Sequence, residues 1–327
     1  MTGLNLTMKR SKKRSFRRMM LDYPYLMSLM VCLFLLIVNG IFEPRSLGFE
    51  GLLGTLNSYL PLMIVAMGQT YVVFAGDIDL SVGSIISLVN VATVALIAYY
   101  GSGYDAIGIG ILCGLGIGVA CGFFNGICIA VFRFQPIVTT FATGVIFGGL
   151  ALWIMPNSGM AVPEYYWDNY AGEVLGIPFV ILILIFMALL ITIIARHKFT
   201  LLLKAIGDDI QPAFQTGLPV VQTRIKGYMM CGLFAAISSL CLTGDTASGD
   251  PLLGVKTTLL SVAAVVLGGT ALSGGSGSTI GSAVGALIIG LIGSVVFFAG
   301  ISYEYQNLVQ GLIVLLALAG GVMVSKR

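Results

Sequence analysis

The sequence carries very little charge for its length. Of its 327 residues, 9% are Asp, Glu, Lys or Arg and 57% are hydrophobic, whereas a soluble domain has roughly 25% charged residues. This composition excludes an ordinary soluble protein and indicates a chain that crosses a membrane many times. Such a chain grows by adding spans, so its length does not give a number of domains.

Residues that support catalysis or metal binding are also scarce. The sequence has one histidine, His197, and its six cysteines lie within or at the ends of apolar stretches without a C-x-x-C pair. We therefore expect no metal site and interpret the cysteines as reduced packing residues. The motif G-x-x-x-x-G-K-[ST], which holds nucleotide phosphates, is absent as well. The chain itself is thus expected to hold no cofactor, and P-loop binding of ATP is excluded.

Positive charge is concentrated at the N-terminus. Seven of the 17 Lys and Arg residues lie in the first 18 positions, directly before an apolar stretch that begins at Pro24. A basic run can bind nucleic acid, but one that precedes a membrane span is more typical of contact with anionic lipid of the inner leaflet. The apolar stretch is long enough to span and has no A-x-A cleavage site. We expect a basic cytoplasmic tail over 1–23, a transmembrane domain over 24–327, and no nucleic acid partner.

Hydropathy predicts an all-α polytopic membrane protein with about ten transmembrane helices, some of them short or broken. When these spans alternate, the segments rich in Lys and Arg fall on the side of the N-terminus, so both termini are expected in the cytoplasm. Segments 75–84 and 268–278 share a pattern of Gly and Ser that indicates two similar halves. A glycine at every fourth position of 110–126 predicts a close packing seam. The expected spans are 24–42, 59–76, 81–100, 106–132, 137–156, 177–195, 226–243, 257–272, 279–299 and 305–324.

Two acids lie between the second and third expected spans. A carboxylate at membrane depth costs roughly 2.5–3.5 kcal/mol and needs water, a partner or a helix N-terminus. Asp79 and Ser81 lie at the start of the third span and are candidates for capping its free N–H groups. Asp77 has no such local role, so it is the stronger candidate for a residue of a solute pathway or gate. Asn90 and Asn125 lie inside spans, where both interhelical hydrogen bonding and contact with a polar solute remain open.

The loop 196–226 joins the sixth and seventh expected spans. It is too polar to span and too apolar to be a solvated linker. Its helix signals are a start at Gly207 and Asp208, a short amphipathic helix that includes Gln211, and a stop at Gly217. The apolar face of such a helix needs a partner to cover it. We expect a cytoplasmic protein to bind here.

With these features the chain resembles the permease subunits of ribose-type (carbohydrate) ABC importers. The resemblance rests on GDIDLSVGS at 76–84, on KAIGDD, TGLPVV and RIK within 204–226, and on AAVVLGGTALSGGSG at 263–277. It implies that the loop with Gly207, Asp208, Gln211, Gly217 and Arg224 couples to a cytoplasmic ABC ATPase, which would hold ATP and Mg. It further implies an extracytoplasmic solute-binding protein, and a second permease copy or a paralogue, in a bacterial inner membrane.

Two other functions compete with this interpretation. An ion-coupled secondary sugar transporter would use Asp77 as its proton or sodium site and would need no ATPase. An intramembrane serine protease would use Ser276 with His197 as base, but His197 lies between Arg196 and Lys198, where an exposed basic cluster is the simpler explanation. We expect a permease, not an enzyme, that imports a monosaccharide or a similar small polar solute.

Overall fold

The computed structural model describes residues 25–302, 304–306, 308–309, 311–313 and 315. The expected basic tail and most of the expected span 305–324 therefore lie outside the described residues. The strands of the described part form two short antiparallel pairs, β1 (Met160–Ala161) with β4 (Ser248–Gly249) and β2 (Glu173–Val174) with β3 (Ile177–Pro178). The helices are α2 (Tyr25–Phe42), η1 (Pro44–Leu47), α3 (Phe49–Phe74), α4 (Val82–Tyr99), α5 (Tyr104–Ala130), α6 (Pro136–Ile154), α7 (Glu164–Ala171), α8 (Phe179–Arg196), α9 (Lys198–Asp208), α10 (Ile210–Gln215), α11 (Val220–Thr246), α12 (Thr257–Leu267) and α13 (Thr279–Phe298).

The expectation of a mostly helical, multi-span membrane protein is confirmed. Seven helices of the described part are long and apolar enough to cross a membrane, namely α3, α4, α5, α6, α8, α11 and α13. The apolar stretches Leu26–Phe42 and Thr257–Leu267 are shorter. Each expected span up to residue 299 thus coincides with an apolar helix.

Besides η1 and α7, two further helical segments were not expected from hydropathy. α3 begins at Phe49, ten residues before the predicted start of its span. The polar residues of 49–58 lower the local hydropathy, but Leu53 and Leu56 pack against buried residues of the bundle and extend the helix. The first part of the loop 196–226 forms α9, whose buried Leu203 and Ile206 pack on the bundle. Tertiary packing, rather than local hydropathy, therefore decides that both segments are helical.

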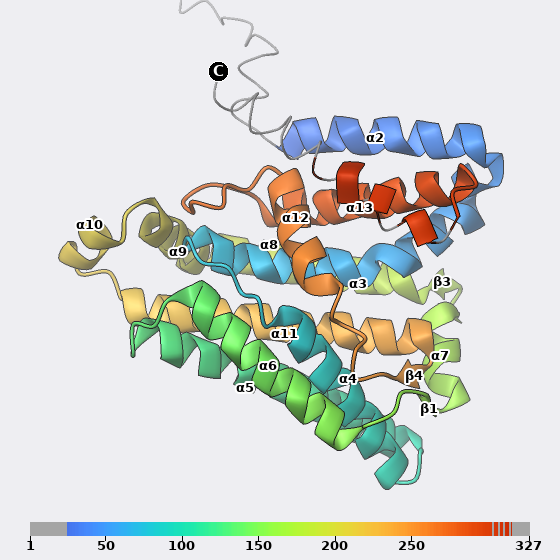
Figure 1. The fold of residues 1–327 in the computed structure, drawn as a ribbon, viewed down its shortest axis with the longest axis horizontal. Coiled ribbons are helices and arrows are strands. Elements are labelled where there is room, and N and C mark those ends of the chain that lie inside the picture. The colour runs from blue at the N-terminus through green and yellow to red at the C-terminus, as the bar shows by residue number, and fades with distance from the viewer. Residues whose placement is uncertain (1–24, 303, 307, 310, 314, 316–327) are drawn as a thin grey trace, which may run out of the picture.

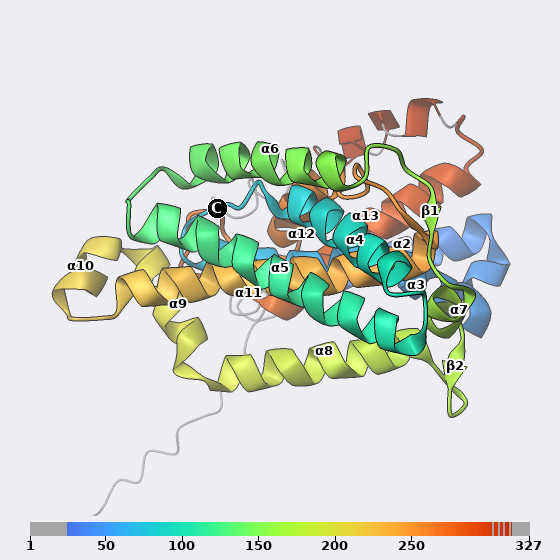
Figure 2. The same cartoon turned by 90° about the horizontal axis from the view of Figure 1, so that it is seen from below.

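Helix α11 lies at the centre of the bundle, packed against α3, α4 and α5 (Figures 1 and 2). The predicted glycine seam of α5 lets α11 approach very closely. A Cβ added at Gly122 would overlap the carbonyl oxygen of Tyr228, and one added at Gly118 would lie 2.5 Å from the carbonyl oxygen of Gly232. On the other side of α3, α2 packs against α13, and α12 packs against α13 as well.

The two ends of the bundle differ in structure and charge. One end, called the α10 end, carries α9, α10 and the α5–α6 connection; the other, called the α7 end, carries α7 and the short strands (Figures 1 and 2). Of the eight Lys and Arg residues that the structure describes, only Arg45 and Lys256 lie away from the α10 end. The six at the α10 end are Arg133, Arg196, Lys198, Lys204, Arg224 and Lys226.

Replacement of Gly122 by alanine should destabilise the contact between α5 and α11. The new methyl group overlaps backbone of α11 that has no rotamer to adjust, so we expect a loss of about 1–3 kcal/mol. The measurement is the thermal midpoint of the detergent-solubilised protein. Gly116→Ala is the matched control, because nothing lies within 4 Å of its added Cβ and alanine favours a helix over glycine. Equal thermal midpoints for the two variants would contradict the close packing of α5 against α11.

Candidate functional site

The connection between α3 and α4, residues 75–81, folds back into the α10 end of the bundle. Gly76 turns the chain with a φ of 81°, a conformation that glycine adopts without steric cost. The chain then returns beside α3, where the side-chain amide of Gln69 donates to the carbonyl of Asp79 at 3.2 Å. This fold places two carboxylates among packed helices.

Asp77 forms a buried ion pair with Arg224 of the first turns of α11. The Arg224 Nη2 atom lies 2.7 Å from Asp77 Oδ2 and 2.9 Å from Oδ1, and Nε lies 3.2 Å from Oδ2. The two side chains are 7% and 14% exposed. Burial raises the pKa of the Asp77 carboxyl, and Arg224 opposes that rise. The partner of Asp77 is not local, as its lack of a capping role suggested, but lies 147 residues away in the sequence.

Asp79 is fully buried and organises the turn before α4. Its Oδ1 accepts hydrogen bonds from the Ser81 backbone N–H at 2.8 Å and from the Ser81 hydroxyl at 2.6 Å. The Ser81 hydroxyl in turn accepts from Asn125 Nδ2 at 2.8 Å. Burial raises the pKa of the Asp79 carboxyl and the hydrogen bonds from Ser81 lower it. Asp79, Ser81 and Asn125 thus form one network that links α4 to α5.

Ser81 occupies the N-cap position of α4 but does not cap the helix with its side chain. The prediction of that role fails because Asp79 binds the hydroxyl. The N–H of Gly83, in the first turn of α4, donates instead to Thr258 Oγ1 of α12 at 3.1 Å. The start of α4 is therefore tied to a helix that is distant in sequence.

Asn90 lies apart from this network, nine residues after Ser81 along α4. Its Nδ2 donates to Thr243 Oγ1 at 2.7 Å and to the carbonyl of Ser248 at 3.2 Å, and its Oδ1 accepts from the N–H of Asp250 at 2.7 Å. The side chain is fully buried. In the described structure Asn90 fastens the segment after α11 to α4.

Three segments meet at the α10 end by direct backbone contact. A Cβ added at Gly207 of α9 would overlap the carbonyl oxygen of Phe74 and lie 2.6 Å from the nitrogen of Gly275. That nitrogen donates to the Phe74 carbonyl at 3.1 Å. A Cβ added at Gly274 would lie 2.8 Å from the nitrogen of Gly76 and 2.9 Å from Cα of Gly207. We call these four glycines, 76, 207, 274 and 275, the glycine junction; it joins the two segments that share the Gly and Ser pattern.

Lys204, which precedes Gly207 by one turn of α9, closes the same contact. Its Nζ donates to the carbonyl of Gly277 at 2.8 Å and lies 4.6 Å from the centre of the Phe74 ring. Burial lowers the pKa of Lys204. Sequence reasoning did not select this residue, because its contacts with Gly277 and Phe74 join segments that are far apart in the sequence.

The predicted amphipathic helix of the loop is present as α10. Asp209 Oδ1 accepts from the N–H of Gln211 at 3.0 Å and caps it, and Gly217 follows with a φ of 78°. Its apolar residues do not all face the bundle: Ala213 is buried, whereas Ile210 and Phe214 are 42% and 64% exposed. The structure therefore presents two apolar side chains at the tip of the α10 end.

The remaining predicted coupling residues do not lie in α10. Asp208 is the last residue of α9, and a Cβ added at Gly275 would overlap its carboxylate. Arg224 lies in α11 and faces Asp77. A residue expected in the pathway and one expected in the coupling loop thus form one ion pair.

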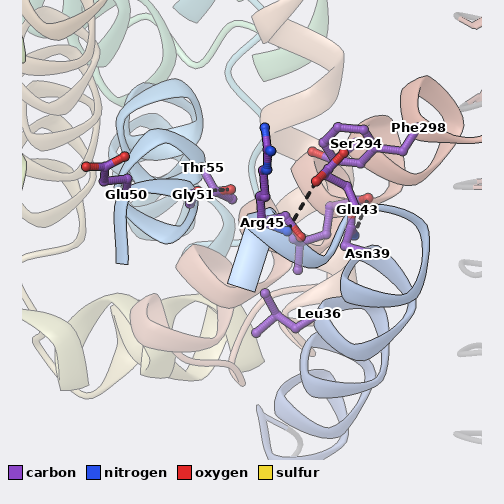
Figure 3. Close-up of a pocket in the computed structure, with 11 residues that line it drawn as sticks. Leu36, Asn39, Glu43, Arg45, Glu50, Gly51, Thr55, Ser294 and Phe298 are labelled. Carbon is purple, nitrogen blue, oxygen red and sulfur yellow. Dashed lines mark hydrogen bonds between the residues drawn. The ribbon is translucent and has the colours of Figure 1, made fainter. Parts of the chain in front are cut away.

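A cavity of about 400 Å³ lies at the α7 end, between the ends of α2, α3 and α13 (Figure 3). Asn39, Glu43 and Arg45 are among its lining residues, and none of the residues predicted for the site lines it. Within the part of the chain that the structure describes, no group of three or more His, Cys, Asp or Glu residues is placed to hold a metal ion.

The sequence matches a family model described as the permease component of the branched-chain amino acid transport system, over residues 51–318. The chain belongs to this permease family. The permease is 36% identical to the ribose import permease RbsC of Bacillus subtilis over 288 residues, 86% of this chain and 88% of the relative. It is 33% identical to the L-arabinose transport system permease AraH of Escherichia coli over 88% of each chain.

A third relative, a probable ABC transporter permease y4mJ of Sinorhizobium fredii, is 31% identical over 86% of this chain and 84% of its own. These relatives are transport permeases rather than enzymes. No solved structure matches the permease. The matched region includes both the Asp77–Arg224 ion pair and the glycine junction.

Replacement of Asp77 by asparagine should destabilise the permease. Removal of one member of a buried ion pair leaves the other charge uncompensated, which costs about 3–5 kcal/mol. The thermal midpoint in detergent measures this loss, and the double variant D77N/R224Q should recover part of it because no unpaired charge remains. Asp105→Asn, at an exposed acid in the first turn of α5, is the control. If D77N and D105N had the same thermal midpoint, the ion pair would not contribute to the stability of the permease.

Proposed function

We propose that the permease is the transmembrane subunit of an ATP-binding-cassette importer that carries a monosaccharide or a similar small polar solute into the cytoplasm. The observation that carries this proposal is the identity of 36% and 33% with permeases for ribose and L-arabinose over nearly the whole chain. The family description names branched-chain amino acids, but both of these relatives are named for pentoses. A polar, hydroxyl-rich solute is therefore favoured over an apolar amino acid.

The orientation follows from charge. Because six of the eight described Lys and Arg residues lie at the α10 end, the positive-inside rule assigns that end to the cytoplasm. The N- and C-termini then face the cytoplasm of a bacterial inner membrane, and the basic tail contacts its lipids. About ten spans in two similar halves complete this topology.

The α10 end suits the binding of a cytoplasmic ABC ATPase, which would hold ATP and Mg. Ile210 and Phe214 present apolar surface on α10, and a short amphipathic helix binds by placing such a face in a groove. Behind it, Gly207 touches the end of α3 and the connection before α13. A displacement of α9 and α10 is thus transmitted directly to two membrane helices.

The Asp77–Arg224 ion pair and the Asp79 network lie at the same end and hold the break between α3 and α4. We assign them to the inner gate of the pathway, where closure of the ATPases would change the packing of the connection 75–81. The solute-binding protein would dock at the α7 end. A second permease copy or a paralogue would complete the path.

Replacement of Gly207 by alanine should uncouple uptake from ATP hydrolysis. The added methyl group overlaps the Phe74 carbonyl and separates α9 from α3, and coupling free energies of roughly 1–3 kcal/mol correspond to about 5–150-fold effects. We expect at least about a fivefold loss of solute uptake in the reconstituted complex, with ATPase assembly unchanged. A thermal-shift screen of the cognate binding protein first identifies the solute.

The control for this variant is Gly54→Ala in α3, whose added Cβ has nothing within 4 Å. G54A should transport normally. Normal uptake by G207A would count against the proposed coupling. Uptake by the purified chain in liposomes under a proton gradient, without an ATPase, would instead favour an ion-coupled secondary transporter.

The orientation has its own test with single cysteines in a Cys113→Ala background, since Cys113 is the exposed cysteine among the described residues. Phe214→Cys lies on α10 and Leu175→Cys in the β2–β3 turn at the α7 end, where Leu175 is 98% exposed. In intact spheroplasts that express the permease without its ATPase, an impermeant maleimide should label L175C at once and F214C only after permeabilisation. The reverse pattern would overturn the assignment of the α10 end to the cytoplasm.

A further inference from the structure

Lys256 is set apart from the other cations of the described residues. Six of those lie at the α10 end, and Arg45 lies in η1 at the α7 end. Lys256 is the N-cap residue of the short helix α12. In Figure 1, α12 crosses the middle of the bundle, steeply inclined to the long helices. The position of this cation needs an explanation, whereas the positions of the cations at the ends of the bundle do not.

Hydrogen bonds fix the position of this segment along α4. The N–H of Asp250 bonds to Asn90, that of Gly254 to Ser87 at 3.0 Å, and that of Gly83 to Thr258 at 3.1 Å. The chain from 250 to 258 therefore runs antiparallel to α4, from the middle of that helix toward its first residues. Because α4 is a candidate membrane span over its full length, Lys256 lies beside a span and not beyond its ends.

The side chain of Lys256 is exposed, as are those of its neighbours on the same surface. Leu252, Val255 and Leu259 are 59%, 60% and 73% exposed. Among the described residues, the ion pair that the structure shows joins Arg224 to Asp77. No carboxylate of these residues pairs with Lys256. Oδ1 of Asp250, the nearest acid along the chain, accepts from the N–H of Leu252 at 2.9 Å.

An ammonium group that faces lipid at this depth is unfavourable. Charged side chains within spans are unfavourable in hydrocarbon and almost always face water or a polar partner. Helix α8 shows the contrast: it has no charged residue before Arg196, and only 17% of its span is buried inside the bundle, as suits a helix surrounded by lipid. The exposed surface around Lys256 therefore differs from a surface that faces lipid.

We propose that Lys256 lines the aqueous path of the importer, on a surface shared with Leu252, Val255 and Leu259. The inference rests on the proposed function and adds the class of solute that the path admits. An ammonium group has three donors and no acceptor, so it binds hydroxyl, carboxylate or phosphate oxygens and repels cations. The path thus favours oxygen-rich solutes that carry no positive charge.

The test uses Leu259→Cys, one turn from Lys256, in the Cys113→Ala background and in the complete reconstituted complex. The probes are two hydrophilic methanethiosulfonates of similar size, one with an anionic sulfonate and one with a cationic trimethylammonium group. Both should react, the anionic reagent faster. In L259C/K256Q the ratio of anionic to cationic rates should fall about three- to tenfold, because a single nearby charge attracts one probe and repels the other.

Leu189→Cys on α8 is the matched control, since Leu189 is 59% exposed on the helix assigned to lipid. It should react with a membrane-permeant maleimide but with neither of the hydrophilic reagents. If L259C behaved like L189C, or reacted with no reagent at all, the surface would face lipid or a protein interface and the inference would be overturned. If the ratio of anionic to cationic labelling rates were the same in L259C and L259C/K256Q, Lys256 would have no electrostatic effect on the path and that part of the inference would be overturned.

Uptake by the same preparation separates this inference from the proposed function. ATP-dependent uptake without hydrophilic labelling of L259C would refute only the assignment of Lys256 to the path. A complex with no ATP-dependent uptake would refute the importer itself.

Discussion

The α10 end of the permease depends on the absence of a side chain at Gly207. Because the backbone of α9 rests directly on the Phe74 carbonyl and on Gly275, no rotamer change can absorb a displacement of α9. Packed backbone moves as a unit, as in other close-packed protein interiors. In the proposed coupling, a force on α10 would therefore act on the end of α3 and on the connection before α13.

The ion pair between Asp77 and Arg224 provides the second attachment of the same loop. α9 is held through Gly207 and Lys204, and α11 is held through Arg224. Between these two attachments α10 buries Ala213 against the bundle and exposes Phe214 at its surface. In the proposed importer, an ATPase bound to α10 would act on the connection 75–81 through both attachments.

The sequence predicted the helices and α10 well because hydropathy and helix signals are local properties. It did not predict the partner of Asp77, because Arg224 lies 147 residues away and no local pattern encodes that distance. The role of Ser81 was mistaken for a related reason: the capping rule considers only nearby N–H groups, whereas the neighbouring Asp79 carboxylate is the stronger acceptor for its hydroxyl. The glycine junction needs three remote segments at once, so only the fold reveals it.

The membrane also explains which polar residues remain available to a solute. Backbone groups freed where a span is broken must find partners within the protein. Thr140 accepts from the N–H of Leu80, Ser87 from that of Gly254, and Asn90 from that of Asp250. These three side chains are thus engaged in holding the broken helices together. In the proposed path a passing solute would then meet polar groups that the fold leaves exposed, among them Lys256 beside α4.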